Sequence, residues 1–179
     1  MKTTFLKLTC ILFLAVAGIA CSSDDDGGAG GGSASNGQVV ASIDGQGFES
    51  FSNTGGQSGG NAIRIDNGNV TSIIVTGIDL EGQSIILTMN SETLAVGSYD
   101  LSDANNIAFT ASYTRVDTQT FQSTSYLAPF ENSGDVGTIT IDALTETNIQ
   151  GTFEFMAANQ NDANDTVSVT NGSFNLDFM

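Results

Sequence analysis

Polar and apolar residues alternate along most of the chain from Val39 to its end. The alternation is clearest in residues 138–143, 149–155 and 173–178. Successive side chains of a strand point to opposite faces, so a period of two predicts strands, whereas a helix would show a period of 3.6. Because Thr, Ser, Asp and Glu fill the polar positions, one face of each strand is solvated and the other is buried. That arrangement is typical of antiparallel sheets.

Turn-forming dipeptides separate these alternating segments. Asp44-Gly45, Asn67-Gly68 and Asn171-Gly172 each join two residues that tolerate positive φ, which is the chemistry of tight hairpins. No ten-residue window beyond residue 20 carries a helical stripe. The chain is therefore predicted to be all-β, either an antiparallel β-sandwich or a β-barrel of roughly 10–12 short strands. The predicted strands lie near residues 38–43, 47–52, 61–66, 70–79, 83–90, 97–101, 105–116, 119–128, 136–144, 148–158, 165–170 and 173–178.

Parity along the predicted strands divides the side chains between core and surface. Tyr113 has the inward parity of its strand, whereas Tyr126 has the parity opposite to Phe121 and Leu127 and is predicted to face outward. Each fully buried apolar side chain contributes about 1.5–3 kcal/mol, so such a core can offset chain entropy without disulfides. The predicted core consists of Ile43, Phe48, Ile65, Ile73, Val75, Ile85, Leu87, Phe109, Phe121, Ile139, Ile141, Phe153, Phe155, Val167, Val169, Phe174 and Leu176.

The chain begins with a segment typical of a secretory signal. Lys2 and Lys7 flank the start of a mostly apolar stretch at residues 8–20, which is too short for a membrane span of roughly 20 residues. A charged start, a short apolar stretch and small residues at its end predict a cleaved signal peptide at residues 1–20. The alternative, a buried helix, is disfavoured because the stretch has no second, polar face.

The end of this stretch, Gly18-Ile19-Ala20-Cys21, resembles the lipobox of bacterial lipoproteins, although Gly18 replaces the usual leucine. The resemblance implies a diacylglycerol on the Cys21 sulfur, whose palmitate-like chains would anchor the protein to a membrane. The alternative is a free or disulfide-bonded thiol. The other cysteine, Cys10, lies in the segment that cleavage would remove, so the processed chain would have no partner for Cys21.

Residues 21–38 are rich in Gly, Ser and Asp and predict a flexible linker with a root-mean-square reach of roughly 20–25 Å. Ser23, Asp24, Asp25 and Asp26 follow directly behind the lipid cysteine. One interpretation of this segment is a solvated acidic spacer. The interpretation that we favour is an export signal, because the segment resembles the acidic tag behind the lipid cysteine of Bacteroidota surface lipoproteins. The resemblance implies a lipid-anchored protein on the exterior of the cell outer membrane.

Charge excludes several classes of function. The chain has 20 Asp and Glu residues, four Lys and Arg residues and no His. Once the signal peptide is removed, the chain keeps all 20 acidic residues and two basic ones, Arg64 and Arg115, so its net charge is −18. Such a chain cannot neutralise nucleic-acid phosphates, and it lacks the His and Lys that catalytic triads, His-ligated metals and phosphate-binding loops require. We therefore expect a protein that is not an enzyme, holds no cofactor or metal, and binds no nucleic acid.

Two residues are candidate ligand contacts. Arg115 has inward parity close to a predicted strand end. It would either bind an anionic group of a ligand or, as we favour, pair with one of the many acidic side chains. Tyr126 is a candidate because its amphipathic ring is predicted to face outward.

The segment 160–166 carries two weaker signals. Asp162 and Asp165 leave a loose Ca²⁺ site open, although the EF-hand pattern fails because the required glycine and bidentate glutamate are missing. Asp165-Thr166-Val167 resembles the short O-glycosylation motif of Bacteroidota, which implies a glycan on Thr166.

The region 39–179 is predicted to be a single domain, and segments of it resemble a family of uncharacterised Bacteroidota lipoproteins. The resemblance lies in residues 43–48, 96–101, 137–141, 149–155 and 167–174, for example in the sequences Ile-Asp-Gly-Gln-Gly-Phe and Val-Gly-Ser-Tyr-Asp-Leu. It implies an all-β domain and an outer-membrane location. It implies no activity.

These observations favour a surface-exposed binding or adhesion module with a protein or glycan partner. The alternative is a carrier of a small apolar ligand in the interior of the barrel or sandwich, because 11 Phe residues could line a cavity. A hydrolase that uses paired carboxylates ranks below both, since the sequence singles out no pair.

Overall fold

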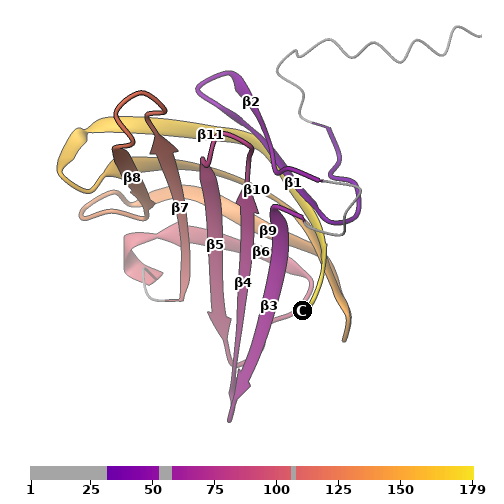
Figure 1. The fold of residues 1–179 in the computed structure, drawn as a ribbon. Helices are drawn as coiled ribbons and strands as arrows, with labels where there is room; N and C mark the ends of the chain where they lie inside the picture. The colour runs from indigo at the N-terminus through magenta and orange to yellow at the C-terminus, as the bar shows by residue number, and fades with distance from the viewer. Residues whose placement is uncertain (1–31, 53–57, 106–107) are drawn as a thin grey trace, which may run out of the picture.

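The computed structural model describes residues 32–52, 58–105 and 108–179. The predicted signal peptide and residues 21–31 of the predicted linker lie outside the described residues. Within these ranges the chain is nearly all β, with eleven strands and one short 3-10 turn, η1, at Asp103–Asn105 (Figure 1). None of the described segments is a helix long and apolar enough to cross a bilayer. The strands are β1 (Gln38–Ile43), β2 (Gln46–Glu49), β3 (Gly60–Asn67), β4 (Val70–Ile78), β5 (Ser84–Ser91), β6 (Gly97–Ser102), β7 (Phe109–Val116), β8 (Ser123–Ala128), β9 (Asp135–Leu144), β10 (Asn148–Asn159) and β11 (Asp162–Asp177).

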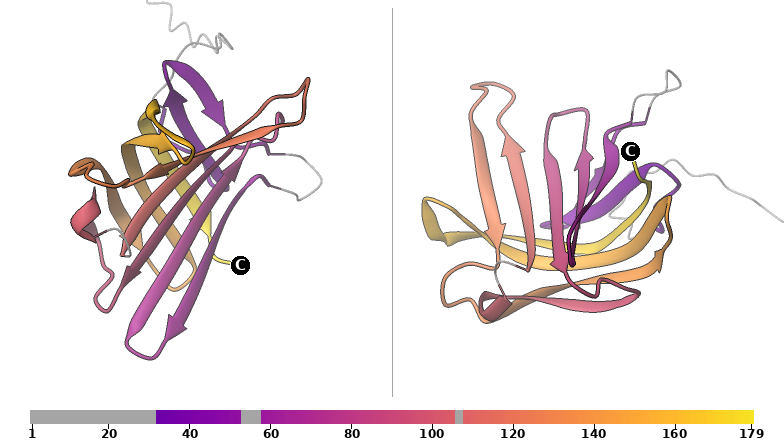
Figure 2. Two further views of the ribbon diagram at one scale, coloured as in Figure 1. Left: turned by 90° about the vertical axis from the view of Figure 1, so that its left-hand side faces the viewer. Right: turned by 90° about the horizontal axis from the view of Figure 1, so that it is seen from below.

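The strands form one antiparallel sheet that folds into two layers. Its order is β2-β1-β11-β10-β8-β7-β5-β4-β3, with β9 also paired to β10 and β6 paired to β9. Strands β3, β4, β5, β7 and β8 make one layer, and β1, β11, β10, β9 and β6 make the layer that crosses it (Figure 2). An isolated bridge between Ala62 and Phe178 joins the layers along one side. The all-β prediction is confirmed, and the architecture is an antiparallel β-sandwich.

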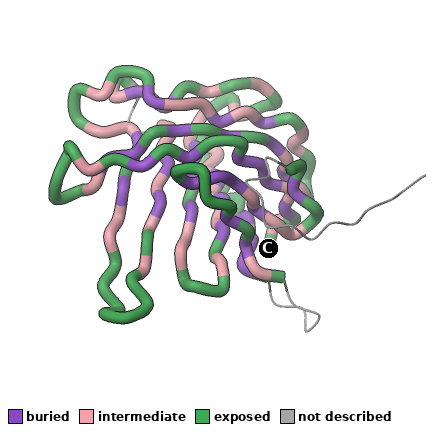
Figure 3. Tube along the Cα trace, turned by 90° about the horizontal axis from the view of Figure 1, so that it is seen from above, coloured by how far each residue is buried: buried purple, intermediate pink, exposed green. Residues whose placement is uncertain are grey.

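The core lies between the layers, where the inward positions of both collect apolar side chains. Figure 3 shows buried residues alternating with exposed ones along the strands. The layers approach closely where β1 meets β4, because a Cβ added to Gly77 would lie 2.7 Å from the Cβ of Val39. The largest fully buried side chains are Tyr126, Phe174, Ile73, Ile85, Leu87, Met89, Leu101, Ile139, Ile141, Ile149, Leu176 and Val39.

Most predicted core residues are buried, but Ile65 is 50% exposed and that prediction is wrong. Ala62 occupies the inward position of β3 and is fully buried, so Ile65 falls on the outer face. The charged residues Arg64 and Asp66 share the inward parity of Ala62. They lie near the end of the strand, where they remain exposed and pair with each other.

The parity assigned to residues 119–128 is also wrong. Tyr126 is fully buried and Phe121 is 83% exposed, the reverse of the prediction. The cause is that β8 begins at Ser123, because a turn precedes it in which the Phe121 N–H donates to the Asp117 carbonyl (2.7 Å). Phe121 has φ 56 in this turn, and alternation counted through a turn loses its register.

The segment predicted as a hairpin at Asn171-Gly172 is instead part of one long strand. β11 runs without interruption from Asp162 to Asp177, and its register against β10 shifts between Phe153 and Phe155. Asn171 has φ 52 at this shift, which identifies a β-bulge. The dipeptide tolerates positive φ in a bulge as well as in a turn, so its chemistry alone does not separate the two.

Candidate functional site

The described chain enters the domain along β11. The Ser173 hydroxyl accepts a hydrogen bond from the Ala34 N–H (2.8 Å) and donates one to the Gly32 carbonyl (2.9 Å). Ala34 is buried, and the Gly37 N–H donates to the Asn175 carbonyl (2.7 Å). Residues 32–37, which the sequence assigned to the linker, therefore lie against the domain.

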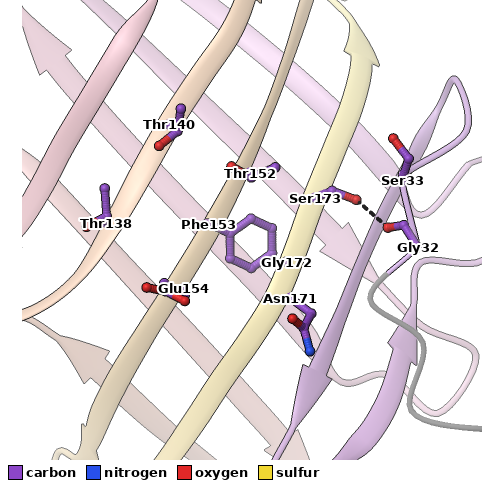
Figure 4. Close-up of a pocket in the computed structure, with 10 residues that line it drawn as sticks. All are labelled: Gly32, Ser33, Thr138, Thr140, Thr152, Phe153, Glu154, Asn171, Gly172 and Ser173. Carbon is purple, nitrogen blue, oxygen red and sulfur yellow. Dashed lines mark hydrogen bonds between the residues drawn. The ribbon is translucent and has the colours of Figure 1, made fainter.

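A groove of about 560 Å³ lies beside this segment on the outer face of β9, β10 and β11 (Figure 4). Cross-strand pairing aligns the hydroxyl residues Thr140, Thr152 and Ser173 along it. Two of the hydroxyls already have partners, because Ser173 holds the N-terminal segment and Thr140 Oγ1 lies 2.9 Å from Ser98 Oγ. Glu154 is the one charged residue in the described part of the lining, so these residues do not concentrate reactive groups.

A second cavity lies at the other end of β1 and contains a predicted ligand contact. We call it the Arg115 cavity, and its volume is about 520 Å³. The β1–β2 hairpin, the β4–β5 turn, β7 and β11 form its walls. Asp44 and Gly45 close the hairpin with positive φ, as the sequence predicted. The cavity is lined by Ile43, Asp44, Gln46, Gly47, Phe48, Glu81, Gln83, Tyr113, Arg115 and Val167.

The structure brings Arg115 and Tyr126 together from the neighbouring strands β7 and β8. The Arg115 Nη2 donates a hydrogen bond to the Tyr126 hydroxyl (2.7 Å), and the guanidinium carbon lies 5.5 Å from the centre of the ring. The Tyr126 hydroxyl donates to Asp165 Oδ2 (3.1 Å), which also accepts a hydrogen bond from Asn159 Nδ2 (2.8 Å). Since its ring is buried, Tyr126 contacts Arg115 through its hydroxyl and ring, and it is a positioning residue instead of an exposed ligand contact.

Arg115 is the uncompensated cation of the described domain. The single salt bridge found among the described residues joins Arg64 Nε to Asp66 Oδ2 at 3.1 Å. Among the described residues, Arg115 forms no ion pair with an acid, so the pairing that we favoured from the sequence is not found there. A guanidinium has five N–H donors, and within the described residues Arg115 uses one of them. The exposed side chain thus presents unused donors at the rim of the cavity.

Tyr113 forms the inner wall of the cavity and stacks on Tyr126, with ring centres 6.0 Å apart. Its hydroxyl donates to Gln83 Oε1, and Gln83 Nε2 donates to Asp79 Oδ2 (3.0 Å). Burial, with a smaller contribution from nearby Asp79, raises the pKa of Tyr113 to about 12, and Arg115 opposes this shift. Burial, followed by Asp165, also raises the pKa of Tyr126, against the opposing effect of Arg115. Both phenols are therefore neutral hydrogen-bond donors near neutral pH, and neither is a base.

The two acids of the loose Ca²⁺ candidate serve local hydrogen bonds. Asp165 accepts from Tyr126 and Asn159, and Asp162 Oδ1 accepts from the Asn164 N–H (3.0 Å). Across the described residues, no three His, Cys, Asp or Glu side chains are grouped as a metal site would require. Thr166 is exposed on β11, so its hydroxyl is accessible.

The other predicted sites cannot be placed in the fold. The lipidation residue Cys21 and the export residues Ser23, Asp24, Asp25 and Asp26 lie outside the described residues. Gln83, which holds the Tyr113 hydroxyl, is not among the residues predicted from the sequence. The one sequence feature that could have identified Gln83 is its position next to the Glu81-Gly82 turn. The pairing of β5 with β7 brings its side chain to the cavity.

Comparison with known proteins gives a family and no activity. The model of a domain of unknown function, DUF6252, matches residues 59–176, which include all the strands from β3 to β10 and nearly all of β11. No curated protein and no solved structure matches the chain. Because the match covers more than half of the sequence, the chain belongs to the family of this domain of unknown function, DUF6252.

Proposed function

We propose that this protein is a non-catalytic binding module, lipid-anchored through Cys21 at the outer membrane and displayed on the cell exterior. Its ligand or partner places an anionic group in the Arg115 cavity. The observation that carries the proposal is the state of Arg115. It is fixed by Tyr126 at the rim of a cavity and leaves donors unused by any described residue, although the chain is otherwise rich in acids.

Guanidinium chemistry defines the group that this site would take. A planar guanidinium matches a carboxylate or a phosphate with two parallel hydrogen bonds. The buried Tyr126 ring and the chain Tyr126–Asp165–Asn159 hold the arginine in place, which lowers the entropy cost of binding. The net charge of −18 repels anions at long range, so only a ligand that makes close contacts in the cavity would bind.

The position of the cavity agrees with surface display. The linker that would carry the Cys21 anchor meets the domain at Gly32, whose carbonyl accepts a hydrogen bond from Ser173 on β11. Gly32 is not among the residues that line the Arg115 cavity. An anchor on this linker would therefore leave the cavity accessible to a ligand.

The alternative of an interior carrier has less support. The space between the layers is filled by large side chains such as Tyr126, Phe174 and Met89, which are fully buried. Protein interiors are packed as densely as organic crystals. An apolar ligand would therefore have to displace these side chains. We therefore favour binding at the surface.

Arginine side-chain NMR tests the ligand site directly. The chain contains two arginines, so the ¹⁵N-labelled full chain gives two Nε–Hε signals, one for Arg115 and one for Arg64 in its salt bridge. Galacturonate, glutamate and inorganic phosphate are titrated as probes. We expect at least one probe to shift the Arg115 signal and to leave the Arg64 signal in place.

Two matched variants provide the control. Arg115→Gln should weaken binding of that probe about ten-fold or more, because a charge-assisted hydrogen bond contributes about 1.5–3 kcal/mol. Arg64→Gln should bind as the wild type does. Equal shifts of both arginine signals, or equal loss of binding in both variants, would contradict the proposal.

Anchoring and display need a separate test in the native host. Cys21→Ser should abolish incorporation of labelled palmitate and release the protein from the membrane fraction. Replacing Asp24, Asp25 and Asp26 by Ala should protect the protein from protease added to intact cells. Membrane association of the Cys21→Ser protein, or unchanged protease sensitivity of the alanine variant, would refute the anchor or the export signal respectively.

The glycosylation proposal for Thr166 rests on its motif and its exposure. Intact mass spectrometry of the protein from its host should show a covalent increment above the polypeptide mass. Thr166→Ala should remove the increment, whereas Thr170→Ala, at another exposed threonine of β11, should retain it. A bare polypeptide mass in the wild type would refute the modification.

A further inference from the structure

We infer a second binding site, separate from the Arg115 cavity, that accepts a neutral sugar of a glycan. It is a hollow of about 680 Å³ between the β8–β9 loop and the β10–β11 turn. Small-molecule sites occupy roughly 300–1,000 Å³, so a hollow of this size holds one or more sugar rings. This inference goes beyond the proposed function, because it assigns another site and another class of ligand.

The two walls of this pocket are fixed by hydrogen bonds to the sheet and within the loop. The Gln160 N–H donates to the Ser125 carbonyl (3.1 Å), and Ala158 pairs with Leu127, so the β10–β11 turn lies beside β8 (Figure 1). In the opposite wall, the Ser133 N–H donates to the Phe130 carbonyl (3.0 Å). The pocket is therefore shaped before any ligand arrives, which lowers the entropy cost of binding.

The lining combines an apolar surface with amide side chains. Leu127 is 39% exposed, and Phe130 is half-buried against the core. Around these lie Asn132, Gln160 and Asn161, whose side-chain amides form no hydrogen bond with the described residues. Asn159 differs from them, since its side chain already binds Asp165 and the Asn161 N–H.

This combination matches the chemistry of a neutral pyranose. Each amide offers two donors and a carbonyl acceptor, so three amides can pair with hydroxyls that both donate and accept. The C–H face of a sugar ring packs on apolar side chains such as Phe130 and Leu127. Among the described residues of the lining, Glu131 is the one that is charged, and a carboxylate without a nearby cation disfavours anionic sugars.

Affinity electrophoresis of the full chain tests the inference. The protein is run in native gels that contain dextran, laminarin or mannan, which are neutral, or alginate, which is anionic. We expect at least one neutral polysaccharide to retard the wild type and the Arg115→Gln variant alike. Alginate should leave the Arg115→Gln variant unretarded, because that variant lacks the guanidinium that would take a carboxylate in the Arg115 cavity. The variant that combines Asn132→Gly, Gln160→Ala and Asn161→Ala should lose about ten-fold in affinity or more.

The controls keep this result separate from folding and from the Arg115 cavity. Asn132 has φ 59, a conformation that glycine adopts freely, so Asn132→Gly removes the amide and keeps the turn. Gln119→Ala removes an exposed amide from a different turn and should bind as the wild type does. If the triple variant unfolds, Gln160→Ala alone should still lose about three-fold. Arg115→Gln should not change the retardation.

Three outcomes would overturn the inference. They are the absence of retardation by all three neutral polysaccharides, equal retardation of the wild type and a folded triple variant, and equal loss of binding in Gln119→Ala. Failure of the Arg115 proposal would appear only in the NMR titration, so the two inferences stand or fall separately.

Discussion

The β3–β4–β5–β7–β8 layer keeps an unbroken antiparallel register, whereas the β1–β11–β10–β9–β6 layer has a shift in each of its pairings. We call these the regular layer and the bulged layer. A bulge bends a strand and increases its twist. The bulged layer contains the two longest strands, β10 with 12 residues and β11 with 16. The comparison of the two layers indicates that long strands bend at bulges in order to cover a small core.

Glycine is the residue that makes the bulged layer close-packed. A Cβ added to Gly151 would lie 2.1 Å from the Thr140 carbonyl oxygen and 2.7 Å from Phe174. A Cβ on Gly172 would lie 2.4 Å from the Phe153 ring. The bulged layer therefore depends on a few backbone positions. Substitutions at Gly151 and Asn171 test that dependence, and substitutions at Tyr113 and Ile65 test the regular layer for comparison.

The largest loss of stability is expected for Gly151→Ala, because the added methyl group would clash with backbone atoms, which cannot move away as a flexible side chain can. Overpacking of this kind should lower the free energy of unfolding by about 3 kcal/mol. Gly47→Ala is the matched control, since a Cβ there meets no atom within 4 Å. Urea unfolding of both variants measures the difference. Equal stability of Gly151→Ala and Gly47→Ala would show that the bulged layer is not close-packed at this point.

The regular layer should be the more sensitive of the two to alkaline pH through Tyr113. The fold favours the neutral phenol, so its contribution is complete below pH 10 and is lost as the pH rises through about 12. A shift of two units corresponds to about 2–3 kcal/mol. Urea unfolding across this range should show that loss in the wild type and a smaller one in Tyr113→Phe. If the stability of the wild type and of Tyr113→Phe fell equally with pH, ionisation of Tyr113 would not be the cause of the alkaline loss.

The bulge at Asn171 should tolerate glycine and reject a β-branched residue. Asn171→Val places a branched side chain at φ 52 and should cost about 1–2 kcal/mol of stability. Asn171→Gly should stay close to the wild type, because glycine adopts this conformation freely. Thermal unfolding of the pair provides the measurement. If the valine variant matched the glycine variant, backbone conformation would not explain the choice of residue at this bulge.

The smallest effect is expected on the outer face of the regular layer. Ile65 is 50% exposed, so Ile65→Thr should change stability by no more than about 0.5 kcal/mol. Ile73→Thr, at a fully buried position of the same layer, should be far more destabilising. Chemical unfolding of the two variants compares them. A large loss in Ile65→Thr would mean that the outer face is covered in solution.

The sequence predicted the strands well where the alternation is unbroken. The predicted strands 70–79, 83–90, 136–144 and 148–158 correspond closely to β4, β5, β9 and β10, because period-two patterning is a local property. It failed at residues 117–122, where a polar turn carries Phe121. A single exposed aromatic residue inside a turn extends an apparent strand and shifts its parity.

The candidate site was predicted in part. Arg115 and Tyr126 were named separately, and the sequence could not show that their strands are adjacent or that the Tyr126 ring is buried. The pairing of Arg115 with an acid was expected from composition, yet the acids near it already bind other groups. Asp44 accepts the Ser168 N–H, and Asp165 binds Tyr126 and Asn159.

The sequence by itself determined the all-β class, most strand positions, the net charge and the resemblance of the N-terminal segment to a lipoprotein leader, because each depends on residues close together in the chain. Tertiary structure decided that Asn171-Gly172 is a bulge and not a hairpin, and that Arg115 lies in a cavity. Both outcomes depend on contacts between strands far apart in sequence, such as β1 with β11 around the bulge and β1–β2 with β7 around the cavity. The pattern of residues within one strand does not determine which distant strand will pair with it. The bulge and the cavity are therefore defined only when the two layers assemble.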